Sequence, residues 1–358
     1  MRTQAIRRTI FIAGLIVLSS CRGGCGRGGD ADRALTVQGR LAMFPAAARI
    51  VAGIDVGQLR ASPSAAKIQA LAVESQADER TLAEFQRRTG FDPMKQLVAL
   101  TVAFPDDARR NGDFGLLLRA DHFDETRLVA YVRDELQKNG DDLVASKRGR
   151  FTLWSSKRDP ALVGFFVDER TFALGAGSWG ARMAELADKT NPADSAATNL
   201  QLVRLVERAA GTHALWAAAM VPAETQRSLA AQPGLAEAAS IDTLSAAIDL
   251  GQGAQAMLIA DVATPEAASA LATKATEALR DAKRNPQVLM LGLGPYLGGV
   301  TAHAVDRTFE VRASLSKEAV EDLVGRLAAM LALARAGQAP GFAPPSPSAP
   351  SPSSPSSP

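Results

Sequence analysis

The sequence predicts an α+β fold made of two related units, each a mainly antiparallel sheet covered by helices. Three observations predict it. Hydrophobic residues make up 47% and charged residues 22% of the 358 residues, an ordinary balance for a globular chain. Short apolar runs bounded by Gly, Pro and Asp recur in pairs, as is typical of hairpins. The same order of strands and helices occurs twice along the chain.

The first unit, residues 41–192, is expected to begin with a strand and to end with a helix. Apolar alternation marks its strands, and capping residues or glycines mark the ends of its helices. Its elements, in order, are a strand at 49–56, two helices between Ser62-Pro63 and Gly90, strands at 97–104 and 113–123, a helix from Asp124 to Gly140, strands over FTLWSS, ALVGFFVD and RTFALG, and a helix at about 178–189.

A connecting helix is expected within 193–212, and the second unit, residues 213–336, follows it. The elements of the second unit, in order, are a strand at 214–221, a helix at 223–239, a hairpin of TLSAAIDL and AQAMLIADV, a helix from Thr264-Pro265, a strand over VTAHAVD, a further strand and a final helix capped by Ser316. Each unit therefore has the ferredoxin-like order strand–helix–strand–strand–helix–strand, extended by one strand and one helix.

Two short internal similarities indicate a duplication. The sequence VDERTF at 167–172 is repeated as VDRTF at 305–309, and both copies stand at a turn between two strands. Ala120-Asp121 and Ala260-Asp261 also follow equivalent strands. Together with the shared element order, these similarities predict a tandem repeat.

Residues 1–20 have the three parts of a secretory signal peptide. Three arginines and no acid lie within 1–8, an apolar run fills 9–18, and small residues follow it. The run is too short to cross a hydrocarbon layer of about 30 Å, which needs about 20 helical residues. The segment therefore predicts export and not a permanent membrane span.

The end of this segment, Leu18-Ser19-Ser20-Cys21, resembles the lipobox of bacterial lipoprotein precursors. The resemblance implies cleavage between Ser20 and Cys21 and a lipid on the Cys21 thiol. It covers residues 1–21 only, and Arg22 in place of an Asp weakly favours the outer membrane over the inner one. The alternatives are an ordinary signal peptide cleaved nearby and a twin-arginine signal at Arg7-Arg8.

Low-complexity segments flank the predicted units. Residues 21–40 are rich in Gly and Arg and predict a flexible tether, and residues 337–358 are almost wholly Pro, Ser, Ala and Gly and predict a disordered tail. The whole layout looks like that of uncharacterised tandem-repeat envelope lipoproteins of bacteria.

Composition argues against several classes of site. Without the three arginines of the signal peptide, the charge balance of 40 basic against 38 acidic residues becomes 37 against 38, so no basic footprint for nucleic acid remains. The two cysteines, Cys21 and Cys25, lie near the N-terminus, which leaves no disulfide framework. The histidines, His122, His213 and His303, are about ninety residues apart, so we name no metal and no cofactor.

The sequence GAGSWG at 175–180 is the one weak candidate for a nucleotide or catalytic site. Gly175, Gly177 and Gly180 match the G-x-G-x-x-G spacing between a strand and a helix, but the following elements do not supply a parallel strand. Ser178 also fits the A-x-S-x-G form of a nucleophile elbow, which would need an acid and His213 or His303. The alternatives are that the glycines ease the start of the following helix and that Ser178 caps this helix.

Residues 288–299, VLMLGLGPYLGG, are an apolar run that Gly and Pro interrupt. We expect a buried linker that covers the sheet. The alternatives are a loop that touches a membrane or a partner, and the lip of an apolar pocket.

The sequence therefore predicts a lipid-anchored cell-envelope protein, outer-membrane-bound and facing the periplasm, that acts as a binding or structural module and not as an enzyme. Its expected partners are the membrane, through the N-terminal lipid, and an envelope protein. Two alternatives remain, a periplasmic carrier of an apolar ligand and a serine hydrolase that uses Ser178.

Overall fold

The computed structural model describes residues 36–63, 65, 79–106, 112–189, 193–211, 213–232, 236–290 and 292–336. The predicted signal peptide, Cys21, Cys25 and the predicted tail lie outside the described residues. The α-helices are α2 (Val37–Leu41), α3 (Val56–Ala61), α5 (Glu79–Thr89), α6 (Pro93–Gln96), α8 (Glu125–Lys138), α9 (Trp179–Ala187), α10 (Leu200–Ala210), α11 (Ala223–Ala230), α12 (Pro265–Arg284), α13 (Pro286–Met290) and α14 (Lys317–Ala336).

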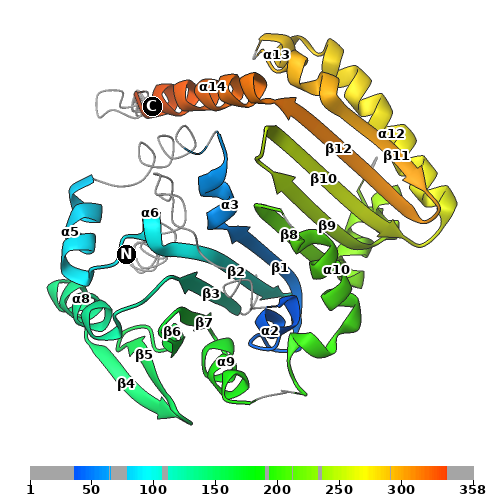
Figure 1. Cartoon of the computed structure of the whole chain (residues 1–358). Helices are drawn as coiled ribbons and strands as arrows, with labels where there is room; N and C mark the ends of the chain where they lie inside the picture. Colours follow the sequence, from blue (N-terminus) through cyan, green and yellow to red (C-terminus); the bar gives the residue numbers. More distant parts are fainter. Residues whose placement is uncertain are drawn as a thin grey trace, which may run out of the picture.

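Twelve strands form one sheet in the order β11-β12-β10-β9-β8-β1-β2-β3-β7-β6-β5-β4 (Figure 1). The strands are β1 (Ala48–Asp55), β2 (Leu97–Pro105), β3 (Phe114–Ala120), β4 (Leu143–Arg148), β5 (Phe151–Ser156), β6 (Val163–Asp168), β7 (Thr171–Ala176), β8 (Leu215–Met220), β9 (Ile241–Asp249), β10 (Gly253–Val262), β11 (Val300–Val305) and β12 (Thr308–Ser316). Every neighbouring pair is antiparallel, so the predicted mixture of helices with an antiparallel sheet is confirmed.

The ferredoxin-like order is not confirmed. A split βαβ unit makes the strands on either side of its crossover parallel. Here β1 and β2 flank the connection that contains α3, α5 and α6, yet they are antiparallel neighbours, and Asp55 at the end of β1 pairs with Ala99 near the start of β2. The connection returns the chain to the end of the sheet from which it left, so no crossover forms.

The two predicted units share this sheet and meet at its centre. Strands β1–β7 form one side and strands β8–β12 the other, and β1 pairs with β8 from Ile50–Ala219 to Ile54–Leu215. Between them, Gly53 pairs with Trp216, whose indole lies across the glycine. The backbone ladder is therefore continuous from one unit to the other.

Apolar residues are buried on both faces of the first unit because its strands alternate between two helical layers. Leu117 of β3 belongs to a cluster with Phe44, Trp179 and residues of α10, whereas its neighbours Leu116 and Leu118 belong to a cluster with Phe91 and Phe123. Helices α2, α9 and α10 supply the first cluster, and the region of α5 and α8 packs on the second.

The order of elements repeats between the units. The first unit runs strand, helices, two strands, α8, two strands and α9, with the β4–β5 hairpin inserted after α8. The second unit runs β8, α11, β9, β10, α12, β11, β12 and α14. The VDERTF sequence lies at the β6–β7 turn and the VDRTF sequence at the β11–β12 turn, which are equivalent positions in this order.

Several expected elements differ from the structure. Strand β4 was not predicted, because most of its side chains are exposed and show no apolar alternation. The helix expected at 223–239 is shorter, since α11 ends at Ala230 and a 3₁₀ turn follows at Glu237–Ser240. Helix α2 begins at Val37, inside the range of the predicted tether.

Among the described helices, none is long and apolar enough to cross a membrane.

Candidate functional site

The described part of the predicted apolar run at 288–299 forms a projecting connection between α12 and β11, which we call the tip (residues 285–290 and 292–299). It contains α13, a tight turn at Gly292 with φ of 66°, and the 3₁₀ helix η4 (Gly294–Gly299). The side chain of Asn285 accepts a hydrogen bond of 2.9 Å from the backbone of Gln287, which starts α13 beside Pro286.

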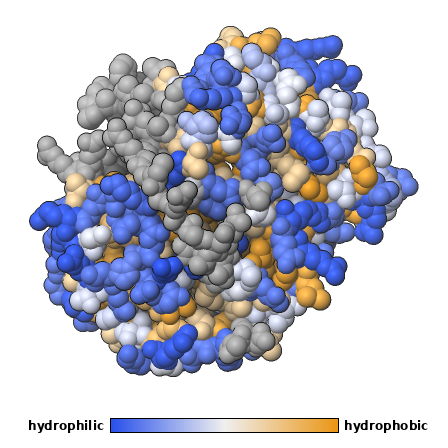
Figure 2. All heavy atoms as spheres, viewed as in Figure 1, coloured by the Kyte–Doolittle hydropathy of each residue, from blue (hydrophilic) through white to orange (hydrophobic). Residues whose placement is uncertain are grey.

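The tip is not the buried linker that we expected. No described residue of 288–299 is buried, and the side chains of Leu289 and Met290 are 55% and 85% exposed. Figure 2 shows hydrophobic atoms at the top of the molecule, where Figure 1 places α13. The physical reason is that α12 packs along β11 and β12, so a helix and not the tip covers this part of the sheet; of the tip, η4 contacts β12.

Contacts with α14 hold the base of the tip. The Tyr296 hydroxyl donates a hydrogen bond to the Asp322 carboxylate, which also accepts one of 3.0 Å from Nε of Arg326. The Arg326 guanidinium lies against Gly292, where a Cβ would be only 2.3 Å from its Nη1. The hydrogen bond to Asp322 raises the pKa of Tyr296, and those from Tyr296 and Arg326 lower the pKa of Asp322. The tip is therefore a braced loop.

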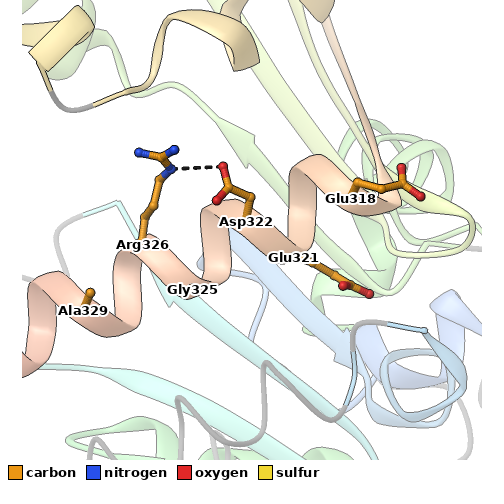
Figure 3. A pocket seen from close by; sticks show the side chains of 6 residues that line it. All are labelled: Glu318, Glu321, Asp322, Gly325, Arg326 and Ala329. Carbon is orange, nitrogen blue, oxygen red and sulfur yellow. Dashed lines mark hydrogen bonds and ion pairs between the residues drawn. The ribbon is translucent and has the colours of Figure 1, made fainter.

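An open depression of about 530 Å³ lies along α14 beside the tip. Its lining residues are Glu318, Glu321, Asp322, Gly325, Arg326 and Ala329. Figure 3 shows Arg326 and Asp322 on one side of the helix and Glu321 on the other. Four of the six lining residues carry a charge, so this depression does not favour an apolar ligand.

Three basic side chains, Arg280, Lys283 and Arg284, lie at the end of α12 where it runs into the tip. All three are exposed, and none forms an ion pair within the described part of the chain. Cations in the last turn of a helix also favour its dipole, which is a local reason for two of them. These three residues were not among the predicted functional residues, although all three stand shortly before the apolar run in the sequence.

The glycines at 175–180 are explained by packing between β7, β6 and α9. A Cβ on Gly175 would lie 2.6 Å from Cα of Gly180, and a Cβ on Gly180 would lie 2.6 Å from Cβ of Val163. Gly177 has a φ of 62° and lies against the Asp113 carboxylate. These contacts favour the interpretation that the three glycines permit the chain to turn and pack closely at the start of α9 over the interpretation that they bind a nucleotide.

Ser178 lies at the N-cap position of α9, but its side chain makes no capping hydrogen bond. Its hydroxyl and its backbone N–H instead both donate 2.9 Å hydrogen bonds to the carboxylate of Asp113. A carboxylate therefore occupies the N-terminal end of α9, which is where a bound phosphate would be stabilised. No local pattern indicates this partner, because Asp113 lies 65 residues earlier in the chain.

The histidines proposed as partners of Ser178 pair elsewhere. Nδ1 of His213 lies 2.8 Å from Asp249, and Nε2 of His303 lies 3.1 Å from Glu310, both within the second unit. Neither shares a hydrogen bond with Ser178, so the structure does not assemble the triad. Within the described residues, no group of three or more His, Cys, Asp or Glu could hold a metal ion.

Comparison with known proteins gives little beyond this geometry. No family model matches the chain, and no curated protein matches it. Two solved structures titled as crystal forms III and I of TP0453 are similar at 12% identity, covering 81% of this chain and 97% and 96% of theirs. Their TM-scores are 0.42 and 0.39.

Proposed function

We propose that this protein is a lipid-anchored component of a bacterial cell envelope, bound to the outer membrane and facing the periplasm, whose sheet acts as a binding or structural module. The observation that carries the proposal is the sequence Leu18-Ser19-Ser20-Cys21 after a short apolar run. A lipid on Cys21 would hold the sheet at the membrane, because acyl chains contribute about 0.8 kcal/mol per buried methylene.

We also propose that the two α+β units are a tandem repeat, in which helices cover the sheet to different extents. The repeated element order and the equivalent positions of the VDERTF and VDRTF turns support it. The hydroxyl of Ser178 donates to a carboxylate and not to a histidine, which supports a binding role over hydrolysis.

The test is to replace Cys21 by Ala in the full-length precursor, with Cys25→Ala as the matched control. We expect a palmitate analogue to label the wild type and the Cys25→Ala variant, and both to need detergent for extraction. The Cys21→Ala variant should lose the label. Unlabelled wild type, or equal labelling of all three, would contradict the anchor.

A carrier of an apolar ligand is the second candidate, because one face of the second unit is incompletely covered. Leu258 and Ile248 are 37% and 38% exposed and lie on the same face, since Leu258 pairs with Ala246, two residues before Ile248. Native mass spectrometry of the chain purified without detergent tests this role. A mass excess that disappears on denaturation would support a carrier, and the bare mass would count against it.

A further inference from the structure

We propose that the tip is a second membrane-contact site, which inserts Leu289 and Met290 among the lipids of an anionic bilayer surface. This inference rests on the proposed function, since a lipid anchor would bring the protein to that surface. It adds a protein contact that the lipid anchor does not supply.

The tip exposes two large hydrophobic residues. Met290 is the most exposed large hydrophobic residue in the described part of the chain, at 85%, and Leu289 precedes it at 55%. Single exposed apolar residues are ordinary on soluble proteins. Here two consecutive exposed residues, Leu289 and Met290, form the end of α13, the short helix that follows α12 (Figure 1). Transfer of both side chains into the interface between headgroups and acyl chains would remove this apolar surface from water.

Positive charge lies next to these apolar residues. Arg280, Lys283 and Arg284 precede Leu289 by five to nine residues at the end of α12, and they carry three positive charges that no described acid pairs with. An apolar end flanked by cations is the pattern of interfacial membrane contacts, because the cations remain at the headgroups while the apolar side chains insert. A protein partner would need shape complementarity over a larger area.

The tip is held in place by α14. The Tyr296–Asp322–Arg326 contacts and the close approach of Arg326 to Gly292 fix it there. A braced loop loses little conformational entropy when it inserts, so more of the gain from burial is retained.

The length of chain after Cys21 limits how far the sheet can lie from the bilayer. Thr36, the first described residue, lies fifteen residues after Cys21, and a chain of that length spans at most about 54 Å. The proposed lipid would thus keep the sheet near the bilayer, where a weak contact at the tip is strengthened by high local concentration.

The experiment measures vesicle binding without the acyl chains. The mature chain from residue 21, carrying Cys21→Ser, is sedimented with vesicles of phosphatidylcholine containing phosphatidylglycerol and with vesicles of phosphatidylcholine alone. We expect stronger binding to the anionic vesicles, weakened by salt. The double variant Leu289→Asp, Met290→Asp should bind at least about tenfold less. The double variant Lys283→Ser, Arg284→Ser should lose about fivefold per cation.

The matched control is the double variant Leu200→Asp, Val305→Asp, which adds the same two charges at residues that are 66% and 60% exposed and lie outside the tip. It should bind as the unchanged chain does, and circular dichroism should show that all variants remain folded. Equal binding by the tip variant and the control would overturn the proposal, as would equal binding to neutral vesicles. Absence of binding to either vesicle would also overturn it and would make a protein partner the occupant. These outcomes are independent of Cys21 labelling, so failure of the tip is distinguishable from failure of the anchor.

Discussion

Replacing Gly53 by Ala tests whether the two units depend on one another through the centre of the sheet. Gly53 of β1 pairs directly with Trp216 of β8, and the indole covers the position that a Cβ would take. An added Cβ would lie 2.4 Å from Cζ2 of Trp216, where an ordinary carbon–carbon contact is about 3.5–4.0 Å. The indole would have to move by about 1 Å.

The cost follows from how tightly the indole is held. Trp216 is 5% exposed, and the guanidinium of Arg40 lies over its ring at 5.5 Å from the centroid. Overpacking of such a site costs about 1–3 kcal/mol. Gly to Ala within a strand would alone contribute about 0.5–1 kcal/mol in favour of folding. We therefore expect a net loss of about 1–2 kcal/mol in the free energy of unfolding.

The measurement is urea unfolding followed by tryptophan fluorescence and by circular dichroism. Gly251→Ala is the matched control, because a Cβ at Gly251 would meet nothing within 4 Å. In the background of Trp216→Phe the cost of Gly53→Ala should shrink, since the smaller ring leaves room for the methyl group. The reasoning is refuted if Gly53→Ala is as stable as Gly251→Ala, or if its cost is unchanged in the Phe background.

Three further substitutions test local contacts. Burial raises the pKa of Asp261, but hydrogen bonds from Arg208 and two threonines outweigh this effect and lower the pKa below its ordinary value. Asp261→Asn should therefore lower the free energy of unfolding by about 1 kcal/mol near neutral pH, after allowance for the partial exposure of the carboxylate. Urea unfolding should show that this difference vanishes as the pH falls through the lowered pKa. A fluorophosphonate probe should leave Ser178 unlabelled, and labelling abolished by Ser178→Ala would restore the hydrolase hypothesis. Gly180→Ala should lower the free energy of unfolding by about 1–3 kcal/mol because its Cβ would overlap Val163, and a thermal melt equal to that of the wild type would contradict the packing explanation.

Most strands and helix starts could be predicted because their signals are local. The strand expected at 97–104 is β2, and Asp124 accepts the capping hydrogen bond of α8 from Arg127 at 3.0 Å. Thr264 likewise caps α12, with Pro265 as its first residue. These features depend on neighbours within four residues of one another, which a single sequence displays.

The candidate site could be predicted only in part because its properties depend on distant residues. The run at 288–299 stood out by composition, but its exposure follows from the position of α12 over β11. The pairing of Ser178 with Asp113 also joins residues far apart in the sequence. Strand pairing between the units was likewise beyond local patterns, since the central β1–β8 ladder joins segments about 165 residues apart.

The distribution of aromatic residues explains why one repeated element order gives two unequal units. Of the 13 phenylalanines in the chain, ten lie within 41–192 and one within 213–336. In the first unit five of these rings form a chain of contacts with 5.0–6.3 Å between centroids, and their bulk fills the space between the sheet and the layer of α5 and α8.

The second unit has alanines at many equivalent positions, as in the LWAAAM sequence of β8, and they bury less area per residue. Its strands β10, β11 and β12 are consequently less buried than β3 and β7. The first unit buries apolar side chains on both faces of its strands, whereas the second leaves Leu258, Ile248 and residues of the tip partly exposed. The two contact sites that we propose, for an apolar ligand and for a membrane surface, therefore both lie in the second unit.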